Sequence, residues 1–227
     1  MIQFYFSGAP NPNKVALLLE ELNLAYEQIP VDVRKGEQFS ADYVKINPNS
    51  KLPAIVDDGH PVFDSNAILL YLAEKHGRFL PDSGPGERGA LLSWLMFVAS
   101  GVGPFSGQSV HFRYYAPEEI PYARNRYQRE AERHYGILDD RLAANRYVLG
   151  DDYTIVDMAV WGWARAMVMV MGEEAAERMV NVQRLVDEVS ARPAAQRAVA
   201  LKDTYTFKTE TDEEARRFLF PQNYPAA

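Results

Sequence analysis

The sequence predicts an α/β domain followed by an all-helical domain. Two observations carry this prediction. The first 80 residues alternate short apolar runs with helical periodicity, in the order βαβ, α, ββ, α. Beyond a segment rich in Pro, Gly, Asp and Ser at 81–89, only helical patterning follows. We therefore expect an α/β domain at 1–80, a linker at 81–89, and a helical domain with a C-terminal extension at 90–227.

Each element of the first domain follows from its spacing of apolar residues. Turn residues bound the short aromatic and β-branched runs, and an i, i+3, i+4, i+7 stripe marks the first helix. The expected elements are a strand at 2–6, a helix with the stripe Val15, Leu18, Leu19 and Leu22, a strand alternating at Ile29, Val31 and Val33, a helix at 40–46, a hairpin of 52–56 and 61–63 around Asp57-Asp58-Gly59, and a helix at 65–76 that Gly77 ends.

The second domain is expected to contain helices near 87–103, 118–145, 154–171, 174–190 and 194–201. Thr154 and Asp157 have the spacing of a capping box, in which the hydroxyl accepts from an amide of the first turn and the carboxylate reaches back to the N-cap amide. This spacing explains Asp157 as a folding element rather than a catalytic acid. The tail at 202–227 carries five aromatic residues, which favours a packed extension over disorder.

Composition excludes several classes of function. Lys and Arg number 24 and Asp and Glu 31, so the net charge is 24 − 31 = −7, and the basic surface that nucleic-acid binding needs is not predicted. There are no cysteines, which excludes a disulfide framework, a thiolate metal site and a thiol nucleophile of the protein's own. We expect no metal and no nucleic-acid partner.

Membrane and targeting segments are not expected either. No basic region precedes the short apolar run at the start of the chain. The longest apolar stretch, 158–171, is broken only by Arg165 and has 14 residues, shorter than a membrane span. It is typical of a buried core helix. The expectation is a soluble, cytoplasmic protein without membrane contact.

Three segments of the first domain carry polar groups beyond what the fold demands. The first is 7–14, between the first strand and the first helix, where a helix start offers an anion site. Here Asn11 is either an N-cap ahead of Pro12 or a ligand-binding amide. The second is 49–53, where Pro53 opens a strand. Either a cis bend exposes the main chain of Leu52 for a ligand, or Pro53 lies on an edge strand.

The third segment contains Asp64 and Ser65, where a strand ends and a helix begins. A helix cap is one interpretation. In the other, Ser65 and the helix start bind a carboxylate while Asp64 binds an ammonium group. An α-amino acid carries both groups.

Taken together, these segments resemble the cytosolic glutathione transferases, which have a thioredoxin-like first domain and an all-helical second domain. The resemblance covers nearly the whole chain and is strongest to the bacterial Nu class and the fungal Ure2-like proteins. The matching motifs are the Asn11 loop, 35–39, 46–57, 64–72, 103–108, 120–127 and 220–224. The chain departs from the Nu class at Ala9, where that class commonly has Thr, which leaves Ser7 or the main chain near Asn11 to compensate.

The resemblance implies a role for each flagged residue. Glutathione, reduced or oxidised, is the implied co-substrate. Asp64 and Ser65 would bind its γ-glutamyl end, and the main chain of Leu52, before a cis Pro53, would pair with its cysteinyl unit. Lys51 and Gln38 would reach its glycyl carboxylate. The amide of Asn11 would donate to its sulfur, and Arg126 would add positive charge nearby. Without the family, Arg126 is a solvated arginine on a helix face. Tyr5 is a poor candidate for the sulfur.

The expected function is that of a glutathione-dependent disulfide-bond oxidoreductase, in which glutathione supplies every sulfur on the enzyme side. One alternative is conjugation to an aromatic electrophile, or cleavage of an ether or halide bond. Its pocket would be lined by Trp94, Phe97, Phe105, Phe112, Tyr114 and Tyr115, although helical aromatics are more often core. The other alternative is a non-catalytic glutathione-binding regulatory module. The family also implies a homodimer.

Overall fold

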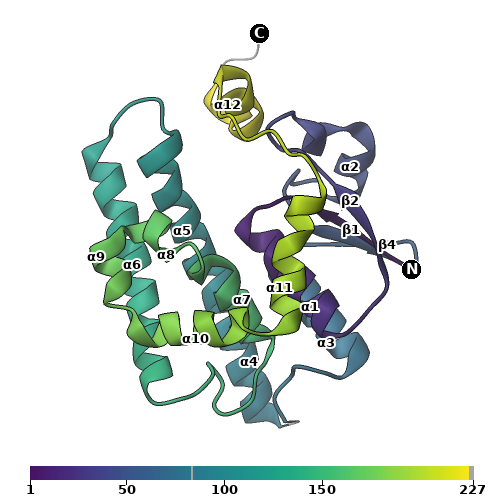
Figure 1. Ribbon diagram of the computed structural model, residues 1–227, viewed down its shortest axis with the longest axis vertical. Helices are drawn as coiled ribbons and strands as arrows, with labels where there is room; N and C mark the ends of the chain where they lie inside the picture. The colour runs from purple at the N-terminus through teal and green to yellow at the C-terminus, as the bar shows by residue number, and fades with distance from the viewer. Residues whose placement is uncertain (83, 225–227) are drawn as a thin grey trace.

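The structure, a computed structural model, describes residues 1–82 and 84–224. A four-stranded sheet and its helices form the first domain, and a bundle of helices forms the second (Figure 1). The strands are β1 (Ile2–Phe6), β2 (Tyr26–Pro30), β3 (Ala54–Asp57) and β4 (His60–Phe63), in the order β2-β1-β3-β4. β1 is parallel to β2 and antiparallel to β3, which pairs antiparallel with β4. The predicted fold class is confirmed.

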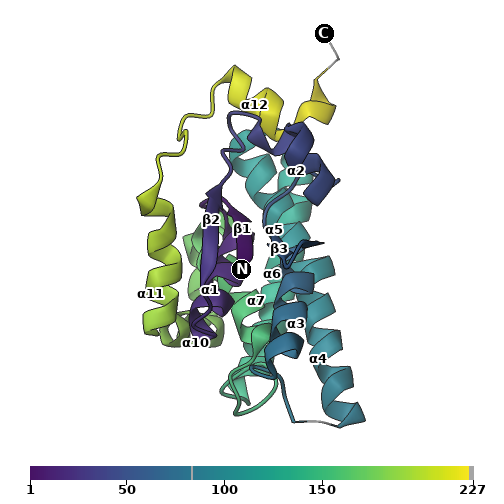
Figure 2. The ribbon, with the colours of Figure 1, turned by 90° about the vertical axis from the view of Figure 1, so that its right-hand side faces the viewer.

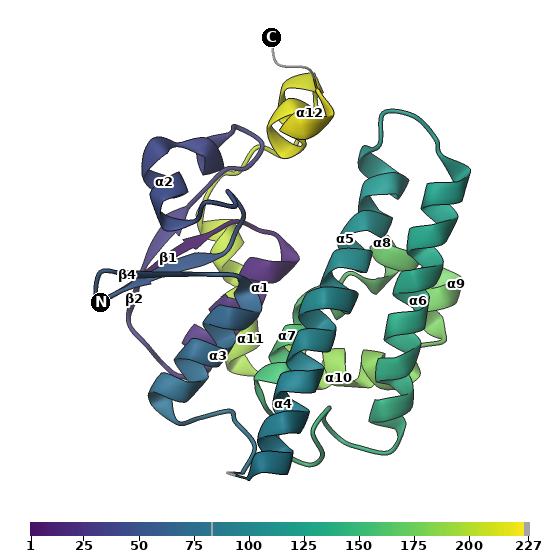
Figure 3. The same cartoon turned by 180° about the vertical axis from the view of Figure 1, so that it is seen from behind.

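The helices of the first domain form where the sequence signals them. α1 (Pro10–Glu21) and α3 (Ser65–His76) pack against each other beside the second domain, and α2 (Ala41–Ile46) lies across the sheet from them (Figures 1 and 3). The Ser40 hydroxyl caps α2 by accepting from the amide of Tyr43 at 3.3 Å. Gly77 ends α3 with a φ of 63°, which glycine adopts without steric cost.

The second strand differs from its expected position. The alternation predicts a strand at 29–33, whereas β2 ends at Pro30. The amide of Val31 still donates to the carbonyl of Phe6 at 2.8 Å, but β1 ends at Phe6 and offers no further partner. The chain then turns at Asp32, whose Oδ1 accepts from the amide of Arg34 at 3.1 Å. Strand pairing therefore overrides the alternation.

Helices form most of the second domain, and the longer non-helical segments between them are 144–154, with an isolated β-bridge between Tyr147 and Gly150, and 205–212. Its helices are α4 (Pro85–Phe97), α5 (Gly103–Val110), α6 (Pro121–Ala143), α7 (Ile155–Ala164), α8 (Met167–Met171), α9 (Glu173–Glu177), α10 (Val180–Ser190), α11 (Pro193–Ala200) and α12 (Glu213–Leu219). α4 begins at Pro85, within the segment expected as a linker. π-Helical turns at Val98–Val102 and His111–Tyr115 extend α4 and α5 into one long helical run.

That run, Pro85–Tyr115, is long and apolar enough to cross a membrane by length and composition alone. It has 31 residues, and its apolar window has a mean hydropathy of 1.4 and is 33% buried. Core helices of globular proteins meet the same criterion. Here Leu91, Leu95, Val98 and Val102 are buried in the core of the molecule.

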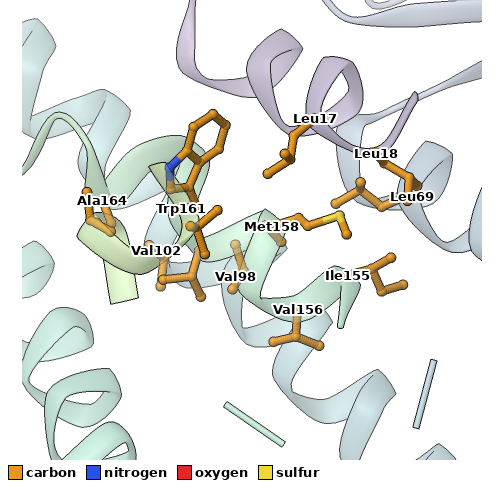
Figure 4. Packing of buried hydrophobic residues seen from close by; sticks show 14 of the residues in the cluster. Leu17, Leu18, Leu69, Val98, Val102, Ile155, Val156, Met158, Trp161 and Ala164 are labelled. Atoms are coloured by element: carbon orange, nitrogen blue, oxygen red, sulfur yellow. The ribbon is translucent and has the colours of Figure 1, made fainter. Parts of the chain in front are cut away.

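One hydrophobic core joins the two domains. Leu17 and Leu18 of α1 and Leu69 of α3 face α7 and the turn after α4 (Figure 4). On the other side of this core, Figure 4 shows Val98, Val102, Ile155, Val156, Met158, Trp161 and Ala164. α7 is the centre of the core, because nine of its ten residues are buried. The two domains therefore share the apolar surface that stabilises each of them.

The capping box at the start of α7 is confirmed. Asp157 Oδ2 accepts from the amide of Thr154 at 2.8 Å, and the Thr154 hydroxyl accepts from the amide of Val156 at 3.3 Å. Asp157 Oδ1 also accepts from the amide of Val148 at 2.8 Å. Burial raises the pKa of Asp157 to about 6, while these hydrogen bonds act in the opposite direction. The residue is a folding element, as its spacing indicates.

The end of the chain packs along the first domain, as its aromatic content predicts. α11 covers the outer side of α1, and the chain then runs past the sheet to α12 (Figure 2). The rings of Tyr205 and Phe207 lie against Phe6, with centroids 5.6 and 6.1 Å away. The amide of Lys208 donates to Asp32 Oδ2 at 2.7 Å. Residues 225–227 of the expected extension lie outside the described residues.

Candidate functional site

The three flagged segments leave the sheet at the same edge. In the register of the sheet, Ala54 at the start of β3 pairs with Tyr5 near the end of β1 and with Phe63 at the end of β4. The loop after β1, the bend before β3 and the turn after β4 are therefore neighbours in space. The sequence order alone does not reveal this, because antiparallel pairing brings the start of one strand beside the ends of the other two.

At the first segment the helix starts earlier than expected. α1 begins at Pro10, and Ala9 is the N-cap, with extended φ and ψ of −78° and 162°. No described side chain caps this helix. The interpretation of Asn11 as an N-cap before Pro12 is therefore wrong. Both prolines fit the first turn, where their missing amide hydrogens have no intrahelical partner to lose.

The side chain of Asn11 contacts the second domain instead. Its Oδ1 accepts a hydrogen bond from Nε1 of Trp163, in α7, at 3.0 Å. Sequence reasoning missed Trp163, because 152 positions separate the pair and no local pattern connects them. The amide of Asn11 thus lies at the junction of the two domains.

At the second segment, the Leu52–Pro53 peptide bond is cis. β3 lies between β1 and β4, so the alternative of an edge-strand proline is wrong. Paired residues of β3 begin at Ala54, which leaves Leu52 outside the ladder. The carbonyl of Lys51 accepts from Tyr43 Oη at 2.6 Å and from Asn47 Nδ2 at 2.7 Å, which anchors the bend, and its side chain is exposed.

At the third segment, the helix-cap interpretation is confirmed. Asp64 Oδ1 accepts from the amides of Asn66 and Ala67, at 2.9 and 3.2 Å, at the start of α3. The carboxylate is nevertheless exposed, and Ser65 beside it is buried. Asp64 also has a φ of 70°, a backbone conformation that is uncommon for a residue with a side chain and that clusters at functional sites. Capping and ligand binding are compatible here, because the cap uses only one of the two carboxylate oxygens.

A buried lysine adjoins these groups and was missed. Lys14, on the inner side of α1, is 1% exposed. Burial lowers its pKa to about 8, and the negative charge of Asp64 acts in the opposite direction. The sequence does contain a signal, since Lys14, Leu18 and Leu22 follow an i, i+4, i+8 spacing along the apolar stripe. This spacing places the ammonium group of Lys14 on the buried side of the helix.

Gln38 is less available than expected. It is 3% exposed, and its Nε2 donates to the carbonyls of Val33 at 3.2 Å and Phe218 at 3.0 Å. Two carbonyl partners fix the amide orientation, so its oxygen is the free atom, buried and without a hydrogen-bond partner among residues 1–82 and 84–224. A carboxylate needs a donor, so Gln38 would have to release a carbonyl to bind one.

Arg126 is not joined to the first domain by any hydrogen bond or ion pair within the described part of the chain. It lies in α6, is 53% exposed, and its Nη1 is 3.1 Å from Glu130 Oε2. Tyr5 packs on Tyr43, and burial with the charge of Glu27 raises its pKa, which agrees with its exclusion as the partner of a sulfur.

The aromatic residues of the second domain pack mainly on one another and on α6. Phe97 and Phe105 both lie against His134, with ring centroids 5.1 and 5.0 Å away. Phe112 stacks on Tyr127 at 5.2 Å. The six aromatic residues expected to line an electrophile pocket are nevertheless half-buried or exposed, and Phe112 and Tyr114 line a cavity between the turn after α5 and the start of α6.

Comparison with known families supports the resemblance. The glutathione S-transferase N-terminal domain family matches residues 1–74, and the glutathione S-transferase C-terminal domain family matches residues 121–198. These two ranges fall in the α/β domain and in the helical domain, in the expected order.

Similar proteins come from bacteria and fungi. The chain is 47% identical over 173 residues to the disulfide-bond oxidoreductase YfcG of Escherichia coli, covering 73% of this chain and 80% of that one. A glutathione transferase from Burkholderia graminis, solved with two glutathione molecules per subunit, superposes with a TM-score of 0.82 at 36% identity over 88% of each chain. The transferase URE2P6 of Phanerochaete chrysosporium, solved with oxidised glutathione, superposes with a TM-score of 0.83 at 32% identity, covering 89% of this chain and 96% of that one. The chain therefore belongs to the glutathione S-transferase family, in the Nu-class and Ure2-like group that its motifs indicate.

Proposed function

We propose that this protein is a glutathione-dependent disulfide-bond oxidoreductase. The observation that carries the proposal is the absence of cysteine from a chain that otherwise builds a thioredoxin-like domain. Disulfide exchange needs a thiolate, so the attacking sulfur must come with a ligand. The relatives support glutathione as that ligand, through the name of YfcG and through the bound glutathione and glutathione disulfide of the two solved structures.

The proposed reaction is two successive thiol–disulfide exchanges. The thiolate of one glutathione attacks a sulfur of the substrate disulfide, a mixed disulfide forms, and the substrate S–S bond breaks to release one thiolate. A second glutathione thiolate attacks the glutathione sulfur of the mixed disulfide and releases the other substrate thiolate. Each released thiolate takes up a proton. Two electrons pass from two glutathiones to the substrate, and glutathione disulfide is the second product.

The residues at the sheet edge are suited to holding glutathione for this reaction. The free carboxylate oxygen of Asp64, with Ser65 at the start of α3, complements the ammonium and carboxylate of the γ-glutamyl end. The main chain of Leu52, outside the ladder, is available to pair with the cysteinyl unit. The Asn11 amide hydrogens complement the thiolate, because a hydrogen bond to the charged form lowers a thiol pKa.

The remaining candidates are weaker parts of the proposal. Lys51 is exposed beside the bend and is free to reach the glycyl carboxylate. Gln38 contributes only if it leaves the carbonyl of Phe218 or Val33. Arg126 adds positive charge only after partly releasing Glu130. We therefore expect the Arg126→Ala substitution to lower turnover less than Asn11→Ala does.

The test is reduction of hydroxyethyl disulfide by glutathione, compared between the wild type and Asn11→Ala. The matched control is Asn13→Ala, which removes an amide from the same helix two positions away. We expect Asn11→Ala to lower the rate about tenfold, since one charge-assisted hydrogen bond is worth about 1.4 kcal/mol or more. Asn13→Ala should retain the wild-type rate.

Negligible rates in both the wild type and Asn11→Ala would overturn the proposal. Transfer of glutathione to chlorodinitrobenzene or cleavage of aryl ethers far faster than disulfide reduction would instead favour conjugation. Tight glutathione binding without turnover of any of these substrates would favour a regulatory module.

We also propose a homodimer in the cytoplasm, where glutathione provides the reducing pool. Large apolar side chains that are exposed in the single chain support a contact with a second copy of it. Among them are Phe63 on β4 and Met96 on α4. Light scattering of the purified protein should give twice the mass of 25.7 kDa. A monomer at micromolar concentration would contradict this part of the proposal.

A further inference from the structure

The side chain of Asn11 is held from the opposite domain. The Trp163 indole, on α7, donates from Nε1 to Asn11 Oδ1 at 3.0 Å. Both residues are half-buried, so water competes only partly for this hydrogen bond. The pair crosses the junction between the helical domain and the loop that follows β1.

The chemistry of the indole fixes the orientation of the amide. An indole N–H can only donate, whereas a side-chain amide has one accepting oxygen and one donating nitrogen. The atom of Asn11 that faces Trp163 must therefore be the oxygen, since the reverse orientation would set two donors against each other. The two amide hydrogens of Asn11 consequently point away from α7.

The indole of Trp163 lies beside α5 at Gly103 and Gly107. An added Cβ at Gly103 would lie 3.5 Å from Nε1 of Trp163, and one at Gly107 would lie 3.8 Å from the far edge of its ring. Both are ordinary van der Waals distances, so the ring faces two positions of α5 that carry no side chain, and the ring itself leaves room for a methyl group at each.

The start of α1 is fixed against the same helix. At Gly162, beside Trp163, an added Cβ would lie only 2.9 Å from the carbonyl oxygen of Pro10 and 2.4 Å from Cγ of Lys14. α1 and α7 thus approach more closely than any side chain at this position would allow. Donor and acceptor of the hydrogen bond both belong to packed helices.

We propose that Trp163 is a positioning residue for the thiol of bound glutathione. It holds the Asn11 amide with its oxygen toward α7 and its hydrogens free to donate to the sulfur. The inference rests on the proposed role of Asn11. Trp163 does not touch the sulfur, and it acts by keeping Asn11 in the one orientation that favours the thiolate.

The substitution Trp163→Phe removes the indole donor and keeps an aromatic ring. Trp161→Phe is the matched control, because Trp161 lies on the same helix and donates from Nε1 to Ser190 Oγ, also at 3.0 Å, away from Asn11. The readout is the pKa of bound glutathione, from the ultraviolet absorbance of its thiolate across pH. The glutathione dissociation constant, kcat and KM for the disulfide are measured beside it.

For Trp163→Phe we expect the pKa of the bound thiol to rise by about 0.5 to 1, which lowers the thiolate fraction about three- to tenfold at a pH well below that pKa. At that pH kcat should fall by up to the same factor, while the glutathione dissociation constant changes less than about twofold. Trp161→Phe should leave the thiol pKa at the wild-type value. Trp163→His, which retains a ring N–H, should restore part of the effect.

The outcomes separate the two proposals. An unchanged thiol pKa in Trp163→Phe, with a raised one in Asn11→Ala, would overturn the positioning role and leave the proposed function intact. An unchanged pKa in both variants would overturn the role of Asn11 itself.

A measurement on the unaltered residue covers the case in which Trp163→Phe does not fold. The ¹⁵N indole resonance of Trp163 is assigned by elimination, using Trp94→Phe and Trp161→Phe. With glutathione bound, this resonance should titrate at the pKa of the thiol, and Asn11→Ala should abolish the titration. An indole resonance that does not shift as the thiol titrates would contradict the inference.

Discussion

Two helices of the first domain start at the same edge of the sheet, yet they are held in opposite ways. α3 begins with a side-chain cap, because Asp64 accepts from the amides of Asn66 and Ala67. α1 has Ala9 at its N-cap, and no described side chain caps it. Its first three residues are Pro10, Asn11 and Pro12, of which only Asn11 has an amide hydrogen.

The difference shows what the two prolines achieve. A cap serves amide hydrogens that lack partners, and prolines at the first and third helical positions remove two of the four such hydrogens. The polar side chain at the start of α1 is therefore free of capping. In α3, the cap itself holds Asp64 in place through two backbone amides. In α1, which has no side-chain cap, Asn11 is held by a hydrogen bond from Trp163 of the second domain.

The largest expected effect comes from separating α1 from its support. Gly162→Ala places a methyl group 2.9 Å from the carbonyl oxygen of Pro10, so α1 must shift. We expect a loss of about 3 kcal/mol in the free energy of unfolding, measured by urea denaturation. Hydrogen exchange should accelerate in the first turns of α1 and remain unchanged at the start of α3.

The matched control is Gly136→Ala in α6, where an added Cβ meets no described atom within 4 Å. It should be neutral or stabilising by up to about 1 kcal/mol. Equal losses of unfolding free energy in Gly162→Ala and Gly136→Ala would contradict the conclusion that the start of α1 depends on close packing against α7.

The next effect depends on pH and concerns Lys14 of α1. Its pKa is lowered to about 8 in the folded protein from 10.5, so above pH 8 the folded state releases a proton that the unfolded state retains. Lys14 therefore contributes a rise in the unfolding free energy with pH, of about 2 to 3 kcal/mol between pH 8 and 10.5. Burial also raises the pKa of several tyrosines, among them Tyr26, Tyr43 and Tyr135, which lowers the stability over the upper part of this range. The measured quantity is therefore the unfolding free energy of the wild type minus that of Lys14→Met, which should rise with pH by this amount, whereas the exposed Lys45→Met should follow the wild type. A difference that does not change with pH would contradict the burial of a charged amine.

Two substitutions of Asp64 separate its capping role from its charge. Asp64→Ala removes the acceptor for two amides and should cost about 1 kcal/mol of stability. Asp64→Asn keeps an accepting oxygen and should retain the wild-type melting temperature. Both variants should bind glutathione about tenfold more weakly by calorimetry, because both lose the partner of the ammonium group. Normal binding by Asp64→Asn would restrict Asp64 to a folding role.

The smallest effect is expected from giving α1 the cap that it lacks. Ala9 is exposed and already has the extended backbone of an N-cap. Ala9→Thr should stabilise the protein by about 0.5 kcal/mol, less than a usual cap, because only the amide of Asn11 is available as donor. Ala9→Val, which has the same shape without the hydroxyl, should bring no gain. A gain of about 1 kcal/mol in Ala9→Thr, as for a usual N-cap, would show that α1 lacks a cap for some reason other than its two prolines.

Local patterns predicted most of the fold. The helix at 65–76 and its glycine stop, the hairpin around Asp58-Gly59 and the capping box of α7 all depend on neighbours within a few residues. β2 was placed too late, because its extent depends on where its partner β1 ends. The helical continuation to Tyr115 was also missed, since Gly103 and Pro104 look like a stop yet both lie in the first turn of α5, directly after a π-helical turn.

The candidate site divides in the same way. Asp64, Ser65 and the bend at Pro53 follow from local turn chemistry, and the structure has the cap and the cis bond there. The start of α1 was predicted two residues too late, because both Pro10 and Pro12 are suited to the first turn of a helix and the helix begins at the earlier one. The contact of Asn11 with Trp163 and that of Gln38 with Phe218 span 152 and 180 positions, and no periodicity in one sequence encodes them.

The packing of the tail has a consequence for how the protein is made. Asp32 and Gln38 of the first domain bond to the main chain of Lys208 and Phe218, and the Phe218 ring lies over Gly36. A ribosome releases the chain from its N-terminus, so these partners leave it long after the loop at 32–38. They follow their bonding partners in that loop by 176 and 180 positions, and the loop lacks these contacts until they are synthesised. A truncated chain that lacks the tail would contain the whole α/β domain, but its loop at 32–38 would lack the hydrogen bonds to Lys208 and Phe218.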